Sequence, residues 1–441
     1  MHPNRKTVAI IGGGFTGLAA AYELAAAGIA VTVFEADDEL GGLAGTFPVG
    51  TTRLEKFYHH WFTNDRHVLE LVAQLDADDQ VHIRPTATGM YYANRLFRLA
   101  APLDLLRFTA LSLLDRIRLG LLVFKARMHK DWEALDDISA ADWLRRLAGP
   151  TVYRVVWEPL LAGKFGDHAE NISAAWFWAK LVLRGGSRGK GGNENLAYFT
   201  GGFQALADRM AAAIEAKGGT IHRASPVGGL VSENGRIVGL RCGNRTVACD
   251  AILSTVALPV LAQLVDAHAP SAYVADLRKV GYLANICLVL LLDRSLSGLY
   301  WMNVNDPDFP FVGIIEHTNF EPPESYGGQH VVYLSKYLPP SAPLYRMDDD
   351  EVLAFALPHI QRMFPKFQRE WIRSAHVWRA PYAQAVVSRG YSRLVPKLRA
   401  PVDGLYVATM AQIYPEDRGT NYAVRDGRAA ARAMLADFSG G

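Results

Sequence analysis

The stretch that most constrains the fold is the glycine-rich turn near the N-terminus, within TVAIIGGGFTGLAAAYELAAAGIAVTVFEAD. A continuous apolar run predicts a buried strand, the alanine-rich run after the glycines predicts a helix, and an apolar run that ends at Glu35 predicts a second strand. Gly12, Gly14 and Gly17 follow the G-x-G-x-x-G pattern between the first strand and the helix. This order predicts a βαβ unit of a parallel sheet and therefore an α/β fold of the Rossmann type.

The glycines and the acidic residue after the second strand have separate physical roles in binding a dinucleotide. The first glycine permits a tight turn, the second lets the backbone approach a pyrophosphate, and the third lets the helix pack closely on the strand. The helix N-terminus adds N–H groups and a partial positive charge. The acidic residue is placed to accept a hydrogen bond from a ribose hydroxyl, but the pattern alone does not separate FAD from NAD. The predicted cofactor-binding residues of this unit are Gly12, Gly14, Phe15, Thr16, Gly17, Glu35 and Ala36.

Two further stretches favour FAD. Gly41 and Gly42 follow the second strand in FEADDELGGLAGT, and a glycine pair there, next to Leu43, lets the chain pass closely over the phosphates. The last segments, GLYVATM and VRDGRAAARAMLADF, predict a strand and a helix that return to the side of the first strand. The start of this helix would direct a second N-terminus at the other half of the cofactor.

Length, charge and cysteine content limit the other classes. At 441 residues the chain exceeds the usual size of one hydrophobic core, so two domains are expected. The net charge of +2 gives no electrostatic case for nucleic acid as a partner. The three cysteines are too few for a disulfide framework and lack zinc-type spacing, so no metal site is expected and a reducing, cytoplasmic location is predicted.

These features resemble the FAD-dependent amine oxidoreductase superfamily, which contains monoamine oxidase, protoporphyrinogen oxidase, phytoene desaturase and UDP-galactopyranose mutase. The resemblance covers nearly the whole chain and rests on the glycine turn, the stretch from Glu35 to Gly42, and PLLAGKFGDHAENIS, GGFQALADRM, ASPVGGL and GLYVATMAQIYPEDRGTNYAVRDG. It implies FAD as the cofactor and a Rossmann-type, GR2-like FAD-binding domain with an interleaved α+β substrate domain. By resemblance, the following residues are also placed at the FAD: Val227, Arg418, Gly419, Thr420, Asn421 and Tyr422.

The pattern divides the chain into two discontinuous domains. Residues 1–52, 196–258 and 397–441 are predicted to form the FAD-binding domain. Residues 53–195 and 259–396 are predicted to form the substrate-binding domain, which includes a helical insertion. The glycine-rich stretch between Arg184 and Asn195 lacks the G-K-[ST] ending of a Walker loop and is interpreted as a surface loop.

The chain departs from the family pattern in three places. The arginine that many members carry after the glycine pair is absent from GGLAGT. The glycine-acid pair that many members carry after the last strand is replaced by ATMAQ, which offers Gln412. The lysine that many amine oxidases hold near flavin N5 has no counterpart, and Leu283, Ala284 and Asn285 stand nearby. The last departure counts against an amine oxidase and against a fast reaction with oxygen.

Two adjacent histidines in KFYHHWFTND are the first catalytic candidates. UDP-galactopyranose mutase carries a similar H-x-F-H-T-N stretch beside its flavin, and alignment on Thr63 and Asn64 places His59 at its first histidine and Phe62 at its second. Adjacent side chains on an extended segment point in opposite directions, so one of His59 and His60 is expected to face the cofactor while the other packs among aromatic rings. A shared metal is not expected, because the side chains diverge and no carboxylate or cysteine accompanies them.

Three weaker catalytic candidates lie in later stretches. YLSKYLP supplies Lys336, and WRAPYAQ supplies Arg379 and Tyr382. Such cationic and aromatic side chains bind anionic or sugar-bearing substrates through hydrogen bonds and stacking. The alternative for each is an ordinary solvated or packed residue.

The resemblance implies an FAD-dependent oxidoreductase of the protoporphyrinogen oxidase-like and desaturase-like branch. It would transfer a hydride from a C–H or C–N bond of a fairly apolar small molecule to flavin N5, which requires orientation rather than a catalytic triad. The alternative is a UDP-galactopyranose mutase-like enzyme that uses reduced flavin, without net redox change, on a nucleotide- or lipid-linked sugar. A flavin-bearing binding protein without turnover is a third class.

The segment that starts at Leu103 and ends at Phe124 is unusually apolar. As a single helix it would gather its charged residues on one side, with Arg116 as the exception; these are Asp104, Arg107, Asp115 and Arg118. Its longest uncharged run is too short to cross a bilayer. It is interpreted as a core helix of the inserted domain. The alternative is a monotopic patch that contacts a membrane peripherally or admits a lipid substrate.

Overall fold

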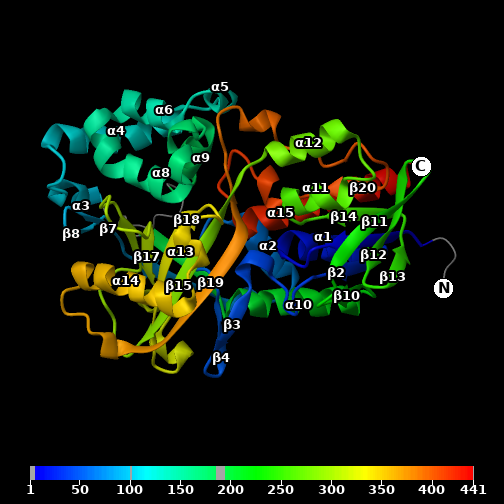
Figure 1. Ribbon diagram of the computed structural model, residues 1–441, viewed down its shortest axis with the longest axis horizontal. Coiled ribbons are helices and arrows are strands. Elements are labelled where there is room, and N and C mark those ends of the chain that lie inside the picture. The colour runs from blue at the N-terminus through cyan, green and yellow to red at the C-terminus, as the bar shows by residue number, and fades with distance from the viewer. Residues whose placement is uncertain (1–4, 100–101, 185–193, 441) are drawn as a thin grey trace.

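The computed structural model describes residues 5–99, 102–184 and 194–440 (Figure 1). β1 (Thr7–Ile11), α1 (Phe15–Ala26) and β2 (Ala30–Phe34) form the predicted βαβ unit. The two strands pair in parallel, because the helix between them carries the chain back across the sheet. Gly12, which joins β1 to α1, has a φ of +108°, a conformation that glycine adopts without steric cost.

Three segments from distant parts of the chain complete this parallel sheet, whose strand order is β10-β2-β1-β14-β20. The added strands are β10 (Thr220–His222), β14 (Ala251–Ser254) and β20 (Leu405–Val407). β1 lies at the centre and pairs with β2 on one side and β14 on the other. The glycine turn therefore leaves the carboxyl edge at the middle of the sheet, where α/β proteins bind ligands.

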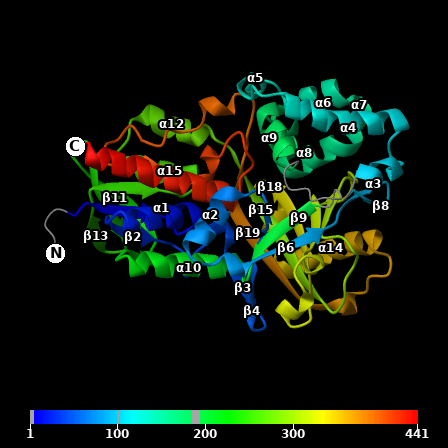
Figure 2. The same ribbon diagram turned by 180° about the vertical axis from the view of Figure 1, so that it is seen from behind.

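Both faces of the parallel sheet are covered. α1 lies between α10 (Gly202–Ala216) and α15 (Thr420–Ser439) on one face (Figure 2). On the other face β14 contacts a small antiparallel sheet, which consists of β11 (Val227–Glu233), β12 (Arg236–Cys242) and β13 (Arg245–Ala248). Because both faces are buried, the strands of the parallel sheet read as continuous apolar runs in the sequence.

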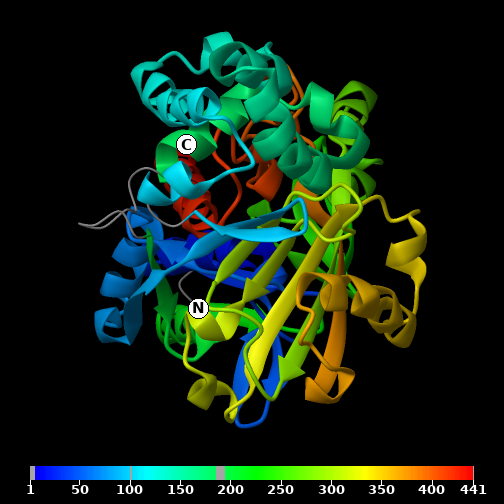
Figure 3. The ribbon, with the colours of Figure 1, turned by 90° about the vertical axis from the view of Figure 1, so that its left-hand side faces the viewer.

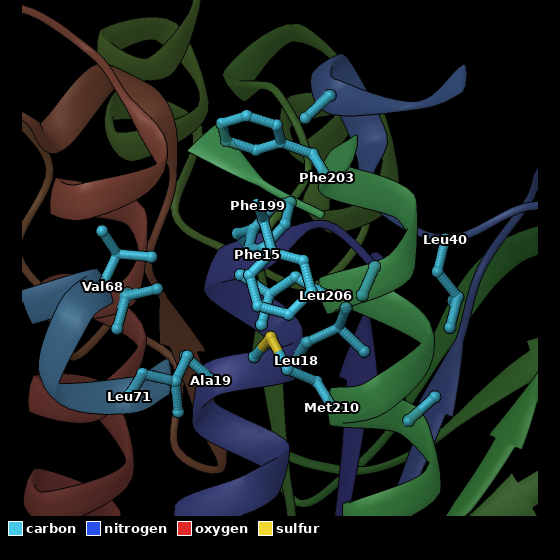
Figure 4. Close-up of a cluster of buried hydrophobic side chains, with 14 of the residues drawn as sticks. Phe15, Leu18, Ala19, Leu40, Val68, Leu71, Phe199, Phe203, Leu206 and Met210 are labelled. Carbon is cyan, nitrogen blue, oxygen red and sulfur yellow. The ribbon is translucent and has the colours of Figure 1, made fainter. Parts of the chain in front are cut away.

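The packing of α1 against α10 holds the glycine turn in position. Figure 4 shows Phe15 and Leu18 of α1 facing Leu206 and Met210 of α10, with Phe203 close by. All five side chains are buried, and the rings of Phe15 and Phe203 meet edge to face with centroids 6.1 Å apart. The first turn of α1 is therefore fixed by a dense apolar core directly behind the glycines.

A second, seven-stranded sheet forms the other half of the molecule, in the order β19-β15-β18-β17-β16-β7-β8. Its two longest strands, β15 (Tyr282–Leu292) and β19 (Ile372–Ala385), run antiparallel. The remaining strands are β18 (His330–Leu338), β17 (Gly313–Glu316), β16 (Trp301–Val304), β7 (Thr88–Tyr92) and β8 (Arg95–Arg98). This sheet supplies one wall of the site described below.

A layer of helices lies over this sheet at one end of the molecule (Figure 3). They are α3 (Pro102–Arg107), α4 (Leu113–Met128), α5 (Glu133–Asp136), α6 (Ala140–Ala148), α7 (Pro150–Val152), α8 (Glu158–Phe165) and α9 (Ala174–Arg184). α8 contacts β16 and β18 and so links the helical layer to the sheet. Most of the predicted glycine-rich surface loop, residues 185–193, lies outside the described residues.

The remaining helices and strands are shorter or lie at the edges of the two halves. They are β3 (Thr46–Val49), β4 (Thr52–Glu55), β5 (Trp61–Phe62), α2 (Arg66–Gln74), β6 (Val81–Thr86), β9 (Glu194–Phe199), α11 (Leu258–Val265), α12 (Ser271–Lys279), α13 (Pro343–Arg346) and α14 (Asp349–Met363). β3 and β4 form a hairpin, and β5, β9 and β6 form a three-stranded sheet. β5 carries the chain from the two histidines toward α2.

The apolar segment interpreted as one core helix is two helices with a largely exposed surface, so that interpretation is wrong. α3 ends at Arg107, and Ser112 starts α4 by accepting the backbone N–H of Asp115 on its hydroxyl oxygen at 3.2 Å. A serine cap of this kind satisfies a free N–H group and so favours a new helix start. Phe124 is 61% exposed. None of the described helices combines the length and the apolar character needed to cross a membrane.

Candidate active site

Gly17 and Gly14 of the glycine turn differ in the space beside them. A Cβ at Gly17 would lie 2.0 Å from the Gly12 carbonyl oxygen, so a side chain there would push α1 away from β1. At Gly14 the nearest heavy atom to an added Cβ is the Cα of Gly42, 3.9 Å away. Gly41 and Gly42 therefore pass close to the glycine turn, and the space beside Gly14 is free for a phosphate-bearing ligand.

The carboxylate of Glu35 lies at the same turn. Its Oε2 accepts the backbone N–H of Gly13 at 2.6 Å, and its Oε1 accepts the backbone N–H of Asp37 at 2.9 Å. A carboxylate has about four acceptor positions, so capacity for a ribose hydroxyl remains. Ser225 donates its backbone N–H to the Glu35 carbonyl at 2.7 Å, which brings the stretch leading to Val227 to the same side of the sheet. The residues present at this end therefore fit a dinucleotide.

A cavity of about 460 Å³ lies where the start of α15, the helical layer and the seven-stranded sheet meet. Leu43, His59 and His60 line it, as do the predicted residues 418–422. Its other walls are mostly aromatic and aliphatic and include Phe57, Tyr58, Val123, Trp157, Leu160, Leu161, Trp176, Phe177, Leu181, Trp301, Val312 and Tyr337. A concave, apolar site of this size with a few polar groups is typical of small-molecule binding.

The start of α15 is held at the cavity by side-chain hydrogen bonds. Thr420 accepts the indole N–H of Trp61 on Oγ1 at 2.8 Å, and Asn421 accepts the backbone N–H of Val68 on Oδ1 at 3.2 Å. Arg418 donates to the Tyr337 hydroxyl at 2.7 Å. These contacts fix the first turn of α15, whose free N–H groups and positive dipole end lie at the cavity wall.

The two adjacent histidines both line the cavity but make different contacts. His59 Nδ1 lies 2.6 Å from the Phe57 carbonyl oxygen, so this nitrogen carries the proton and Nε2 is an acceptor. Burial lowers the pKa of His59 to about 4, and the ring is therefore neutral at pH 7. His60 Nδ1 lies 2.9 Å from the Tyr300 hydroxyl oxygen. Across the described ranges, no group of three or more His, Cys, Asp and Glu side chains gathers as metal ligands would.

The three weaker catalytic candidates do not line the cavity. Ile286 of β15 pairs with both Lys336 and Arg379, and this row faces away from the neighbouring cavity-lining residues because side chains alternate along strands. Arg379 instead donates to the carboxylate of Asp349 at 2.9 Å. Tyr382 packs edge to face on another tyrosine ring, with centroids 5.6 Å apart. Lys336, Arg379 and Tyr382 therefore lie outside the candidate site.

The sequence did not predict a group of charged side chains that lies in the cavity wall. Lys164 of α8 and Lys180 of α9 both donate to the carboxylate of Asp417 at 2.9 Å. Burial, together with the neighbouring Lys180 and Arg418, lowers the pKa of Lys164 to about 7. Although burial opposes ionisation of Asp417, the two ammonium groups hold its pKa far below the usual value. The partners are 237 and 253 positions apart, so no local pattern could have linked them.

The fold and the site together define a Rossmann-type dinucleotide-binding protein with a largely apolar cavity at the start of α15. The family described as flavin containing amine oxidoreductase matches residues 15–435, and the chain belongs to this family. This confirms the predicted resemblance, the α/β fold, FAD as the cofactor and the class of FAD-dependent oxidoreductases.

Curated relatives match parts of the chain. The carotenoid phi-ring synthase of Streptomyces griseus is 32% identical over 190 residues, which cover 38% of this chain and 36% of that protein. The coproporphyrinogen III oxidase of Propionibacterium freudenreichii subsp. freudenreichii is 28% identical over 181 residues, which cover 37% of this chain and 32% of that protein. The chain thus spans about a third of the length of the curated relatives it matches.

Solved structures share the fold over the whole chain. A putative protoporphyrinogen oxidase from Exiguobacterium sp. 255-15 has a TM-score of 0.78 at 18% identity, covering 98% of this chain and 99% of that one. A reduced UDP-galactopyranose mutase has a TM-score of 0.76 at 14% identity, covering 98% and 96%. At these identities the likeness is one of fold.

Proposed function

We propose that residues 1–52, 196–258 and 397–441 bind FAD, and that residues 53–195 and 259–396 hold the substrate against it. The five strands of the parallel sheet all come from the first set of segments, which supports this division. The pyrophosphate would lie beside Gly14 and the ribose at Glu35, because one position is open and the other keeps free acceptor capacity. The flavin end would lie near Leu43 and the start of α15, where the cavity begins.

The reaction we propose is transfer of a hydride from a C–H or C–N bond of a fairly apolar small molecule. The observation that carries this proposal is the cavity itself, which is walled by aromatic and aliphatic side chains and reaches the start of α15. Bound FAD supplies the hydride acceptor, its N5 atom. The chain's own part is to exclude water, to hold the substrate by apolar contact, and to direct the α15 N-terminus at the developing negative charge.

The polar groups of β15 and β18 at the cavity favour an electron acceptor other than oxygen. The cavity-facing position of β15 is Asn285, whose amide donates to the Ser335 hydroxyl at 2.9 Å, and both residues line the cavity. The lysine that many amine oxidases hold near flavin N5 has no counterpart at this position of β15. The neutral His59 offers an acceptor nitrogen rather than a charge, which suits a substrate whose bond breaks without a strong general acid.

Anaerobic reduction of the flavin is the direct test. The purified protein should be yellow, and mixing it with candidate apolar substrates in the absence of oxygen should bleach the flavin absorption. Readmission of air should restore the colour slowly if oxygen is a poor acceptor. Protein that stays colourless and takes up no FAD on refolding would contradict the proposed cofactor site.

The second candidate is a mutase-like reaction on a nucleotide- or lipid-linked sugar. It is favoured by the stretch around Thr63 and Asn64, since both histidines of this stretch lie at the cavity, and by the fold likeness to the reduced UDP-galactopyranose mutase. Product formation only after dithionite reduction, with no net consumption of reduced flavin, would replace the oxidoreductase by this mutase. Bleaching by a substrate alone would exclude it.

We also propose that the protein is cytoplasmic and that α4 holds it at a membrane surface. An apolar stripe with helical spacing is exposed along it and consists of Leu113, Leu114, Ile117, Leu121, Phe124 and Met128. The helix carries four Arg and Lys residues against one acidic residue, which suits an anionic lipid surface. Val123 and Arg127 of the same helix line the cavity, so an apolar substrate could pass directly from lipid to the site.

Co-sedimentation with vesicles tests the membrane contact. The protein should bind vesicles that contain phosphatidylglycerol more tightly than pure phosphatidylcholine. Phe124→Ser should weaken that binding by about tenfold or more, the loss expected when one large apolar side chain no longer enters the lipid. Ile83→Ser is the matched control, because Ile83 is 59% exposed but belongs to β6. Equal binding of both variants and the unchanged protein would contradict the assignment of α4.

A further inference from the structure

The charged group in the cavity wall has one carboxylate and two ammonium groups. Asp417 accepts Lys164 on both carboxylate oxygens at 2.9 Å, accepts Lys180 at 2.9 Å, and also accepts the indole N–H of Trp176 at 3.3 Å. Its side chain is 24% exposed, and those of Lys164 and Lys180 are 15% and 30% exposed. The carboxylate is therefore saturated with donors, while the group as a whole keeps an excess of positive charge.

Each ammonium group has donors that Asp417 does not use. An ammonium has three N–H donors, and the carboxylate takes at most two from Lys164 and one from Lys180. Both lysines line the cavity. Their nitrogens also lie 4.7 Å and 5.1 Å from the ring centroid of Trp176, so the indole holds the two ammonium groups near each other. The N–H groups of the two lysines that Asp417 does not use are suited to a ligand that carries several acceptor oxygens.

The side chains that line the whole cavity also carry an excess of positive charge, as the group around Asp417 does. Four basic side chains line it, namely Lys164, Lys180, Arg127 and Arg418, and Lys164 is only partly protonated at pH 7 because its pKa is lowered to about 7. Two carboxylates, of Asp65 and Asp417, oppose them, and burial raises the pKa of Asp65 to about 6. Excess charge of one sign in a partly buried cavity is costly unless a ligand of opposite charge enters. A cationic amine would be repelled by this surface, whereas an anion would be stabilised.

We infer that the cavity is a subsite for the anionic head group, a carboxylate or a phosphate, of an otherwise apolar substrate, and that Lys164 and Lys180 bind this group. This inference rests on the proposed function, because it places the head group in the same cavity as the hydride transfer. The aromatic and aliphatic walls then receive the apolar body, and the head group fixes which carbon lies nearest the flavin end. The subsite selects against amines, the substrates that the family name suggests.

Binding of small amphiphiles by the FAD-loaded protein tests this inference. The probes are decanoate, decyl phosphate, decylamine and decanol, which share one chain and differ in the head group. Binding is followed by the flavin difference spectrum and, independently, by the fluorescence of tryptophan, since Trp176 lies against both lysines. At least one of the two anions should bind at least tenfold more tightly than decanol, and decylamine should bind more weakly than decanol. The tighter anion distinguishes a carboxylate substrate from a phosphate-bearing one.

Variants decide whether the lysines are responsible. Lys164→Gln and Lys180→Gln should each weaken anion binding at least tenfold and leave decanol binding within twofold. Lys180→Arg should retain most of the anion affinity, because it keeps a positive charge at the cavity. If Lys180 served only to pair with Asp417, the anion affinity would not depend on a positive charge at this position. Lys366→Gln is the control, because Lys366 is exposed and lies outside the cavity.

Two results would overturn the inference: decylamine binding as tightly as the anions, or anion binding that the two glutamine variants leave unchanged. Both can be read from tryptophan fluorescence even in protein without flavin. Failure to bind FAD would instead contradict the proposed function and leave the anion test intact. A variant that unfolds, as judged by circular dichroism, is replaced by the arginine variant at the same position, in which retained anion affinity supports the inference and lost affinity contradicts it.

Discussion

Replacement of Gly14 by alanine separates cofactor binding from folding. Gly14 has φ −74° and ψ 176°, which alanine adopts without strain, and an added Cβ would have its nearest neighbour, the Cα of Gly42, at 3.9 Å. The free energy of unfolding should therefore change by no more than about 1 kcal/mol, the range for substitutions without a steric or polar conflict. The protein should fold as before.

FAD binding should respond quite differently to Gly14→Ala. The new methyl group occupies the open space beside the turn, where we place the pyrophosphate. Loss of a single hydrogen bond from a backbone N–H to a charged phosphate oxygen costs about 1.5–3 kcal/mol. At 1.4 kcal/mol for each factor of ten, the Kd for FAD should rise by about ten- to hundredfold.

The assay is titration of apoprotein with FAD, followed by quenching of flavin fluorescence, with thermal unfolding measured by circular dichroism on the same samples. Gly298→Ala is the matched control, since Gly298 is exposed, has no heavy atom within 4 Å of an added Cβ and lies outside the cavity. An FAD affinity of folded Gly14→Ala within twofold of the unchanged protein would refute the placement of the pyrophosphate.

Three other substitutions or conditions give distinct outcomes. Gly17→Ala should lower the free energy of unfolding by about 3 kcal/mol in a denaturant titration, because its Cβ would lie 2.0 Å from the rigid Gly12 carbonyl oxygen; a loss below about 0.5 kcal/mol would show that α1 shifts freely. Decanoate affinity should fall as pH rises through about 7, because Lys164 then loses its proton in the free protein, and a flat profile from pH 6 to 9 would remove Lys164 from the subsite. His59→Ala should alter the flavin spectrum and turnover more than His60→Ala does, whereas equal and purely destabilising effects would assign both rings to packing.

The parts of the fold predicted correctly are those encoded by local pattern. The glycine spacing after a continuous apolar run specifies a strand, a tight turn and a helix, because the positive φ of Gly12 and the close approach of Gly17 to the Gly12 carbonyl oxygen both arise within the turn. The residues 418–422 were placed by family resemblance, and the structure brings them to one wall of the cavity together with His59 and His60. Their roles at the flavin remain predictions for the experiments above.

Sequence patterns were less informative about whether a side chain faces the cavity, the core or the solvent. Lys336 lies between two cavity-lining residues of β18, yet strand alternation turns it to the other side of the sheet. The apolar segment before Met128 has the composition of a core helix, but neighbouring helices cover only one side of α4 and leave Phe124 exposed. Composition reports that a residue is apolar, whereas burial depends on what packs against it.

The sequence by itself determined the βαβ unit, because the glycine spacing is a requirement that the backbone must satisfy locally, and its resemblance to the family implied FAD as the cofactor. Only the tertiary structure decided the character of the substrate site. Lys164, Lys180 and Asp417 come from α8, α9 and the segment before α15, and they meet because those elements pack around one cavity. Electrostatic interaction depends on distance in space, so a carboxylate shared by two lysines more than 200 positions away leaves no signal along the chain.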